Sequence, residues 1–337
     1  MLIQHNISLK PYNTFGINVF AKHFTSITSV TELIEVLKLK EYPSHFILGG
    51  GSNMLLTKDI NDLVIHINIK GIKVISENET HVIVKANAGE NWHEFVLWCL
   101  KHHYGGVENL SLIPGNVGTA PIQNIGAYGV ELKDTFYSCE TLNINSKEIK
   151  CFNLEDCNFG YRESIFKQEL KDKHIITSVS FKLKKAPHYL QTDYGAITSQ
   201  LSIMDITNPT IKDVSRAVIA IRKEKLPDPK EIGNSGSFFK NPIIPISHYN
   251  QLKNNFSNIP CYPISETEVK VPAGWLIEHS GFKGKTFGDY GVHKKQALVL
   301  VNYGNANGLD ILKLARIIQK TVFKIFQINI ETEVNII

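Results

Sequence analysis

The stretch LSLIPGNVGTAPIQNIGAYGV, residues 110–130, is the most informative part of this chain. It holds four glycines and two prolines but no charged side chain. Its glycines, at positions 115, 118, 126 and 129, interrupt it too often for a regular strand or helix. A buried irregular backbone needs partners for its polar groups, and Gly-rich loops can place N–H groups directly against a ligand. The stretch predicts either the wall of a large cofactor site or a tight turn region packed in a core.

The bulk composition is that of a globular protein of two to three domains, with 337 residues, 43% hydrophobic and 20% charged. A net charge of +4 permits anionic small-molecule substrates but does not form the basic footprint of a nucleic-acid-binding protein. No apolar run approaches the ~20 residues of a membrane helix, and the N-terminus has no signal-peptide pattern. We therefore expect a cytoplasmic protein that binds neither membranes nor nucleic acid.

Cysteine and histidine spacings predict no metal site. The five cysteines show no CxxC spacing, and the thirteen histidines include no HExxH. Reduced, structural thiols are the expectation for a cytosolic chain. The lysine-rich segment 167–185 alternates with apolar residues from position 175 onward, which favours a solvated strand face.

Helix and strand signals alternate along the chain. Ser29 and Glu32 form a capping-box pattern before an apolar helical face. Further helices are predicted at 91–103, 210–225 and 309–326, the last with apolar positions 311, 315, 318, 322 and 325. Strands are predicted at HFIL, LVIHINI, HVIVKANA, ETLNIN, IITSVSFKL and the tail INIETEVNII, and a composition break at 201–209 indicates a domain boundary.

Several candidate groups stand in loops. GGGSN, residues 49–53, follows a strand, as a phosphate-binding turn would, but no Gly-Lys-Ser/Thr follows, so a simple turn remains open. Gln123, Asn124 and Tyr128 offer amide and hydroxyl groups within the Gly-rich stretch. Arg162, in a turn between aromatic residues, is either a surface ion-pair residue or a cation of the site.

The second chemically suggestive stretch is GNSGSFFKNP, residues 233–242, where Ser237 follows a glycine and precedes two phenylalanines. The absence of a GxSxG elbow disfavours a hydrolase nucleophile. Lysines and an arginine at 222–225 end a predicted helix and could meet an anion. Glu331 and Glu333 share one face of the tail; such acids are usually exposed, and a buried one would suggest function.

Taken together, these motifs make the chain resemble the UDP-N-acetylenolpyruvoylglucosamine reductases of peptidoglycan synthesis. The matching motifs occur in family order over nearly the whole chain. They are NTFGI (13–17), GGGSN (49–53), IPGNVGTAPIQNIGAYG (113–129), GYRES (160–164), GNSGSFFKNP (233–242) and AGWLIEHSGFKGKTFGDYGVHKKQALVLVN (273–302).

The resemblance implies an α+β protein with the vanillyl-alcohol-oxidase-like (PCMH-type) FAD-binding fold and a separate α/β substrate-binding domain. The expected limits are 1–70 and 71–205 for two FAD-binding subdomains, 206–321 for the substrate-binding domain, and 322–337 for a tail that returns to the active site. The implied reaction takes hydride from NADPH to FAD, and then from flavin N5 to the terminal carbon of the enolpyruvyl group of UDP-N-acetylglucosamine enolpyruvate, giving UDP-N-acetylmuramate.

The resemblance also assigns residues. It places Arg162, Ser237 and Glu333 in catalysis, with Ser237 as the proton donor to the adjacent carbon. It assigns substrate contacts to Tyr194, on the covering loop that marks one family subclass, and to Lys225, Asn241, Tyr262, Lys283 and Gln296. The FAD-binding positions are Gly49, Gly50, Gly51, Ser52, Asn53, Ile113, Pro114, Gly115, Gly118, Gln123, Asn124, Gly126, Ala127 and Tyr128.

Physical reasoning agrees with these roles. Hydride addition to a carboxylate-bearing double bond builds negative charge on the carboxylate, so cations aimed there stabilise the transition state. Arg162 offers a permanently charged fork for that carboxylate, and Lys225 and Lys283 suit a diphosphate. A neutral serine is a poor acid, so Ser237 needs a neighbouring group, and Glu333 would orient the site or its proton network.

Two positions depart from the family pattern. The family tail usually reads Pro-Glu-Val-Arg, whereas residues 332–335 read Thr-Glu-Val-Asn, which keeps Glu331 as a competitor of Glu333. Position 119 is Thr where many members carry Gly or Ser.

Other function classes remain to be weighed. They are another flavoenzyme of the same fold, such as an oxidase of small alcohols or sugar acids, and a non-catalytic nucleotide-sugar-binding protein. Because the motifs of the substrate half and Ser237, Arg162 and a tail glutamate are all retained, we favour the reductase, with small-molecule partners only and a monomeric state.

Overall fold

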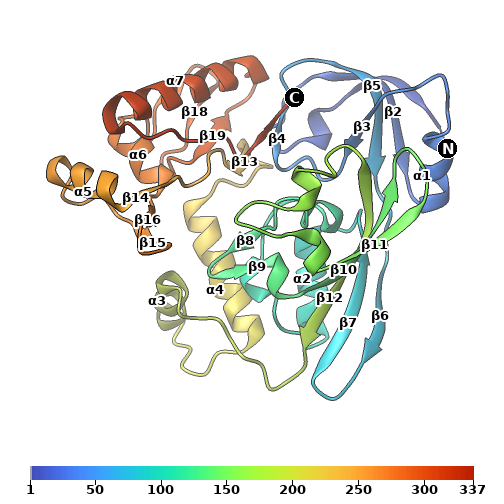
Figure 1. The fold of residues 1–337 in the computed structure, drawn as a ribbon, viewed down its shortest axis with the longest axis horizontal. Coiled ribbons are helices and arrows are strands. Elements are labelled where there is room, and N and C mark those ends of the chain that lie inside the picture. Colours follow the sequence, from blue (N-terminus) through green and yellow to red (C-terminus); the bar gives the residue numbers. More distant parts are fainter. Residues whose placement is uncertain (1) are drawn as a thin grey trace. The chain divides into compact units, whose positions relative to one another are not determined.

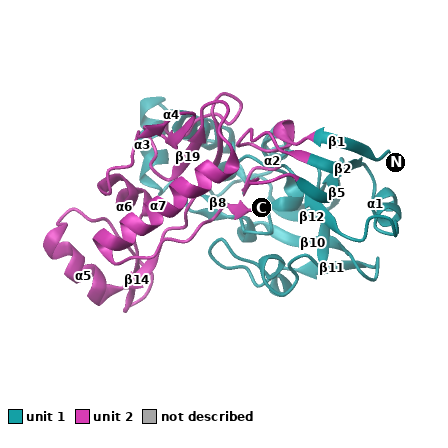
Figure 2. Cartoon of the chain, turned by 90° about the horizontal axis from the view of Figure 1, so that it is seen from above, with its two compact units in different colours: residues 1–7, 21–50, 60–224 teal, residues 8–20, 51–59, 225–337 magenta. Residues whose placement is uncertain are grey.

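The computed structural model describes residues 2–337 (Figure 1). The chain forms two compact units, and each combines stretches that are distant in sequence (Figure 2). Unit 1 holds the residues up to 7, 21–50 and 60–224; unit 2 holds 8–20, 51–59 and 225–337. The four predicted domain limits instead follow the chain in consecutive blocks, and they stay a prediction.

The first sheet of unit 1 contains parallel strands. Its four-stranded sheet has the order β1 (Gln4–Ser8), β2 (Phe20–Ile27), β5 (Ile60–Ile67), β3 (His45–Leu48). Strands β2 and β3 both pair in parallel with the central strand β5. Helix α1 (Val30–Val36) begins as predicted, because the Ser29 hydroxyl accepts from the Glu32 N–H at 3.1 Å. Leu33 and Val36 of this helix are buried with the apolar side chains of β5.

The second sheet of unit 1 is antiparallel throughout. Its strand order is β11 (Ile149–Asn153), β10 (Phe136–Asn143), β12 (His174–Lys184), β7 (His81–Asn87), β6 (Ile72–Glu77). In β12, buried Phe181 and Leu183 alternate with exposed Lys182 and Lys184. The predicted solvated strand face is therefore confirmed for this part of the lysine-rich segment.

Helix α2 (Trp92–Lys101) packs on this sheet as its sequence predicts. Its five buried side chains recur at helical spacing: Trp92, Phe95, Val96, Cys99 and Leu100. The rings of Phe95 and Phe181 lie 4.6 Å apart, so the helix and strand β12 share one core. Asn91 caps the helix by accepting from the Glu94 N–H at 3.1 Å.

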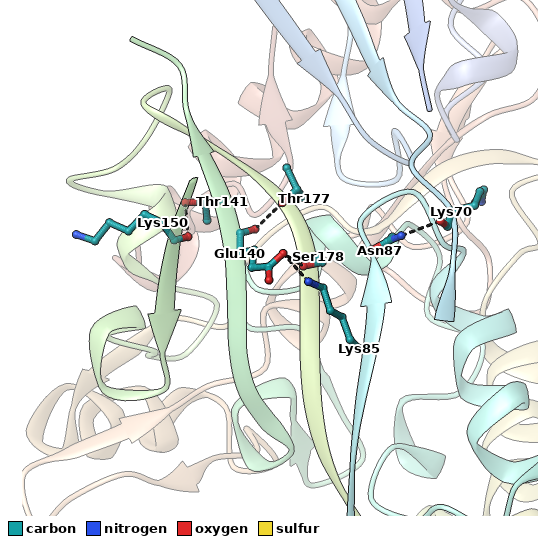
Figure 3. A network of polar contacts seen from close by, with 8 residues as sticks. All are labelled: Lys70, Lys85, Asn87, Glu140, Thr141, Lys150, Thr177 and Ser178. Atoms are coloured by element: carbon teal, nitrogen blue, oxygen red, sulfur yellow. Dashed lines mark hydrogen bonds and ion pairs between the residues drawn. The ribbon is translucent and has the colours of Figure 1, made fainter. Parts of the chain in front are cut away.

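Polar side chains connect the strands of this sheet (Figure 3). Lys85 of β7 and Ser178 of β12 both reach the Glu140 carboxylate of β10, at 2.5 and 3.1 Å. Thr177 donates to the Glu140 carbonyl at 3.1 Å, and Thr141 donates to the Lys150 carbonyl at 3.2 Å. These contacts link neighbouring strands through side chains in addition to the backbone ladder.

The remaining elements of unit 1 are strands and helices, some of which lie within the Gly-rich stretch. They are the short strands β8 (Gly126–Ala127) and β9 (Val130–Glu131), helix α3 (Gly195–Ile203), helix α4 (Ile211–Lys225), and the 3-10 helices η2 (Glu108–Leu110), η3 (Val117–Thr119), η4 (Leu132–Asp134), η5 (Glu155–Cys157) and η6 (Ile165–Lys167). Thr210 and Asp213 bond reciprocally at the start of α4, which confirms the predicted cap. Helices α3 and α4 share a small apolar core.

Unit 2 is built on two antiparallel sheets. One has the order β13 (Gly233–Ser237), β19 (Val299–Asn302), β18 (Tyr290–Val292), β17 (Thr286–Phe287), and the other has β14 (Ile243–Pro245), β16 (Glu268–Lys270), β15 (Tyr262–Pro263). The helices are α5 (Ile246–Asn255), α6 (Ala273–His279), α7 (Gly308–Phe326) and the 3-10 helix η1 (Lys10–Tyr12).

Helix α7 confirms the predicted helix with one correction. Ile311, Ala315, Ile318 and Val322 are buried as predicted, but Ile325 is 41% exposed and Phe326 is buried in its place. The chain leaves the helix there, because Gln327 adopts a left-handed conformation with φ 55°.

The tail after α7 ends in strand β20 (Asn335–Ile336), which pairs in parallel with β4 (Met54–Leu55). No helix formed by residues 2–337 is long and apolar enough to cross a bilayer.

Candidate active site

In unit 1, the first part of the predicted cofactor-binding turn lies directly against the Gly-rich stretch. A Cβ added to Gly49 would come within 2.5 Å of the Thr119 side chain. A Cβ added to Gly50 would come within 2.8 Å of both the Gly115 Cα and the Asn116 side chain. Glycine is therefore required at 49 and 50 for this close backbone approach. Two segments that the sequence assigned to one cofactor thus meet within one unit.

The Gly-rich stretch is fixed from behind by backbone bonds. Trp92 donates its N–H to the Gly115 carbonyl at 3.0 Å, and Gly118 donates to the Ala88 carbonyl at 3.0 Å. A Cβ on Gly118 would collide with Ala88. Ile113, Pro114 and Gly115 remain half-buried in front of this anchored layer. A rigid backbone that leaves small residues accessible is suited to a flat ligand.

Arg162 contacts the same stretch. Its Nη2 donates to the Gly126 carbonyl at 2.8 Å, and a Cβ on Gly126 would come within 3.0 Å of its Nη1. The residue has a left-handed backbone, with φ 57°, in a tight turn between Gly160 and Glu163. Non-glycine residues adopt this conformation rarely, and such strain concentrates at functional sites. The structure therefore places Arg162 at the wall of the predicted site.

The side chain of Asn124, which the resemblance assigns to FAD binding, makes hydrogen bonds with other loops of unit 1. Its side-chain N–H₂ donates to the Glu131 carboxylate at 2.9 Å and to the Gly160 carbonyl at 3.0 Å, and its Oδ1 accepts from the Lys133 N–H at 3.1 Å. The residue is fully buried. Its amide already holds the loops of unit 1 together, so any contact with a cofactor would have to come from its backbone.

Two tyrosines and one arginine form a cluster in unit 1. The Tyr128 and Tyr194 rings meet edge to face with centroids 5.6 Å apart. Arg222 of α4 hydrogen-bonds the Tyr128 hydroxyl, and its Nε is buried without a hydrogen-bond partner among the described residues. Burial raises the pKa of Tyr128 above its ordinary value, so the hydroxyl stays protonated at neutral pH. Tyr194 is 50% exposed and directly precedes α3.

Sequence patterns did not indicate two residues that support this wall, the half-buried His93 and the buried Asn109. His93 of α2 accepts the Leu112 N–H at its Nδ1, at 2.9 Å. Burial is the main cause that lowers the pKa of His93. Asn109, which is 1% exposed, donates to two carbonyls of distant segments. Their partners are separated from them by 19 or more residues, so no local spacing could have identified them.

In unit 2, Ser237 ends strand β13 opposite Val299. The next two side chains, Phe238 and Phe239, are buried and pack on each other with ring centroids 5.1 Å apart. Gly236, with φ 67°, turns the chain just before the serine. The Ser237 hydroxyl is half-buried and makes no hydrogen bond with the rest of the described chain, so it is available to a ligand.

The tail brings Glu333 beside this serine. Glu333 donates its N–H to the Phe238 carbonyl at 2.9 Å, and Thr332 forms a bridge with Phe239. Glu333 is half-buried, whereas the Glu331 side chain is 78% exposed and lies 3.7 Å from the Lys240 ammonium. Of the two tail acids that the sequence left open, Glu333 is the one placed next to Ser237.

The last three residues of the GGGSN turn lie in unit 2 and hold this tail. Asn53 donates from its side chain to the Glu333 carbonyl at 3.2 Å, and its own carbonyl accepts from Asn335. Gly51, with φ 59°, accepts the Thr14 N–H at 3.0 Å. Ser52 is half-buried between them. The assignment of Asn53 to the cofactor stays a prediction, and its side chain and carbonyl contact Glu333 and Asn335 of the tail.

The predicted substrate-binding residues of unit 2 fall into two groups. Asn241 accepts the N–H of Ala273 at the start of α6, at 2.9 Å, and Gln296 lies 3.0 Å from an added Cβ at Gly274. Both residues therefore lie at the start of α6. Tyr262 is 53% exposed, and Lys283 pairs with Glu278 at 2.9 Å. Lys225 is exposed at the end of α4.

Two family models match the chain. Residues 21–151 match a model described as an FAD binding domain. Residues 228–337 match the C-terminal domain of UDP-N-acetylenolpyruvoylglucosamine reductase. The predicted α+β class, with an FAD-binding domain and a separate C-terminal domain, is confirmed by these matches and by the mixed architecture of the chain.

Curated relatives match over the whole chain. The UDP-N-acetylenolpyruvoylglucosamine reductase of Flavobacterium johnsoniae is 61% identical over 337 residues, covering all of both chains. The protein of the same name from Amoebophilus asiaticus is 48% identical over 339 residues, again covering both chains completely. Among solved structures, the reductase of Thermus caldophilus shares the fold with a TM-score of 0.69 at 23% identity, covering 99% of each chain.

Proposed function

The chain belongs to the family of UDP-N-acetylenolpyruvoylglucosamine reductases, and we propose that it reduces UDP-N-acetylglucosamine enolpyruvate to UDP-N-acetylmuramate with NADPH as the electron donor. It is an FAD-dependent oxidoreductase of peptidoglycan precursor synthesis, and so contributes to cell-wall biogenesis, cell shape and division. The observation that supports the finer proposal is the backbone bond from Glu333 to the Phe238 carbonyl, which brings the tail to the residue after Ser237.

The residues present fit an FAD. Gly49 approaches Thr119, and Gly50 approaches Gly115 and Asn116, so closely that a Cβ at either position would fill the space between the segments. Such Gly-rich turns accept phosphates through backbone N–H groups. Ile113, Pro114, Gly118, Gln123, Gly126, Ala127 and Tyr128 would complete the binding wall of unit 1. When bound, FAD supplies the hydride transfer that no side chain of this protein can perform.

Arg162 binds the carboxylate of the enolpyruvyl group. Its guanidinium donates to the Gly126 carbonyl at 2.8 Å, which fixes a permanently charged, planar group suited to a carboxylate. Reduction of the double bond raises the negative charge on that carboxylate. A fixed cation therefore stabilises the transition state more than the bound substrate.

Ser237 donates the proton to the carbon next to the one that receives hydride. Serine is a weak acid, and the neighbouring carboxylate of Glu333 organises the proton network that supplies it. The buried Phe238 and Phe239 fix the backbone beneath the serine, so its hydroxyl is held without the help of an internal hydrogen bond.

The nucleotide-sugar half of the substrate needs cations and amides. Lys225 and Lys283 suit the diphosphate, Tyr194 and Tyr262 offer hydroxyls on exposed rings, and Asn241 and Gln296 offer amides. We propose a monomeric enzyme in the cytoplasm with small-molecule partners only.

Steady-state kinetics with purified protein test this proposal. NADPH should be consumed only when the enolpyruvyl sugar is present, with one product molecule for each NADPH. Consumption that needs oxygen but not the sugar would indicate an oxidase of the same fold. Binding of the sugar without any NADPH consumption would indicate a binding protein that has lost catalysis.

A further inference from the structure

Asn109 connects the two loops that carry Tyr128 and Tyr194. Its single side-chain N–H₂ group donates to the Tyr128 carbonyl at 3.0 Å and to the Gln191 carbonyl at 2.8 Å. Both hydrogens are therefore used, and the residue is only 1% exposed. Gln191 lies three residues before Tyr194, at the start of the loop that the proposed function assigns to substrate covering.

The first loop depends on such an anchor. Tyr128 and Gly129 form the turn between β8 and β9, and both have positive φ, 51° and 82°. A two-residue turn of this kind favours Asn-Gly, because a bulky residue with positive φ is strained. The bond from Asn109 holds the Tyr128 carbonyl in that conformation, and the Tyr128 ring then supports Tyr194 edge to face.

The second loop combines a packed side chain, Leu190, with exposed ones beside a cavity. A cavity of about 480 Å³ lies between the turn and the segment before Tyr194, and Gly129, Val130, His188, Tyr189 and Gln191 are among the residues that line it. Tyr189 is 74% exposed and Tyr194 is 50% exposed. Leu190 packs on the apolar core and His188 contacts the His103 carbonyl at 3.0 Å, whereas the bond from Asn109 to Gln191 is the contact that ties this segment to the Tyr128 turn.

We propose that Asn109 is a positioning residue that fixes the distance between the Tyr128 turn and the Tyr194 loop, and so determines how well the loop covers the substrate. This inference rests on the proposed function for the identity of the substrate. Asn109 does not touch the reacting atoms; it acts through the backbone of the two loops.

The test uses full-length holoenzyme with Asn109→Leu, which keeps the volume but removes both donors. Loss of one to two hydrogen bonds predicts a roughly tenfold higher KM for the enolpyruvyl sugar. We expect kcat to change by less than about threefold and the flavin content to be unchanged. Asn109→Asp should act in the same direction and more strongly, because a carboxylate would face two carbonyl oxygens.

Limited proteolysis with chymotrypsin gives a second readout that needs no activity. Cleavage after Tyr189 or Tyr194 should be faster in Asn109→Leu than in the wild type, and the enolpyruvyl sugar should slow it. The control is Ser215→Ala, which removes the 2.7 Å bond between Ser215 of α4 and Ser111, another buried polar contact of the same region. This variant should keep the wild-type KM and cleavage rate.

The possible results distinguish a failure of the role of Asn109 from a failure of the proposed function. Unchanged KM and unchanged cleavage in Asn109→Leu, or equal changes in Ser215→Ala, would overturn the inference. If the wild type shows no reductase activity, the proposed function fails, while the cleavage contrast still decides whether Asn109 restrains the loops. If Asn109→Leu does not fold, Asn109→Ser, which retains one donor, should show the same pattern at smaller magnitude.

Discussion

Replacing Ser237 by alanine should slow the reaction without lowering the stability of the fold. The serine hydroxyl makes no hydrogen bond with the rest of the described chain, while the backbone pairing with Val299 and the burial of Phe238 and Phe239 do not involve it. Its removal should therefore change the free energy of unfolding by no more than about 0.5 kcal/mol. Loss of a positioned general acid instead lowers the rate by about 10²–10⁴-fold, which is about 2.7–5.4 kcal/mol of barrier.

Anaerobic stopped-flow measurements of the flavin absorbance follow the two half-reactions separately. Reduction of the flavin by NADPH should proceed at the wild-type rate in Ser237→Ala, and reoxidation by the enolpyruvyl sugar should slow at least about 10²-fold. Slowing of both half-reactions by the same factor, or reoxidation within tenfold of the wild type, would remove Ser237 from the role of proton donor.

Ser235 provides the matched control on the same strand. Its hydroxyl is 7% exposed and donates to the Met54 carbonyl at 3.2 Å. Ser235→Ala should therefore lower the free energy of unfolding by roughly 1 kcal/mol, and both half-reactions should remain close to the wild-type rates. Ser237→Ala should thus keep the stability and lose activity, whereas Ser235→Ala should lose stability and keep the activity.

Four further substitutions test other parts of the account. Arg162→Lys keeps the positive charge but loses the paired N–H donors of the guanidinium. The KM for the enolpyruvyl sugar should therefore rise about tenfold or more while the flavin stays bound. A colourless protein would contradict the assignment of Arg162 to the substrate carboxylate. Glu333→Gln should lower kcat at least about tenfold, whereas Glu331→Gln, at an exposed side chain, should leave kcat within about twofold; equal losses in steady-state assays would refute the distinction. The lowered pKa of His93 stabilises its neutral form, which accepts the Leu112 N–H. That stability is present above pH 6.5 and is lost as the pH falls through the lower folded-state pKa, so the thermal midpoint of His93→Asn should fall less between about pH 8 and pH 5 than that of the wild type.

Local patterns predicted the regular elements well. The apolar spacing of α2 and the capping residues of α1 and α4 were correct, because side-chain burial and capping act within a few residues. The error at Ile325 arose at the last turn of α7, where the chain changes direction and the helical period no longer decides which side chain is buried.

Contacts between distant segments could not be predicted in this way. The sequence shows that Asn124 is polar, but not that its amide is fully used by Glu131, Gly160 and Lys133. The resemblance favoured Glu333 but kept Glu331 as a competitor, because the pairing of the Glu333 backbone with Phe238 cannot be seen in the sequence. Motif recognition supplied the candidate residues of the site, whereas the contacts that support them could be identified only from the fold.

The measurement that tests the central claim most directly is an anaerobic visible spectrum of the purified protein. NADPH is added first, and UDP-N-acetylglucosamine enolpyruvate second. The account predicts a yellow protein that NADPH bleaches and that the enolpyruvyl sugar restores. A protein that holds no flavin, or one whose bleached flavin the sugar does not reoxidise, would contradict it.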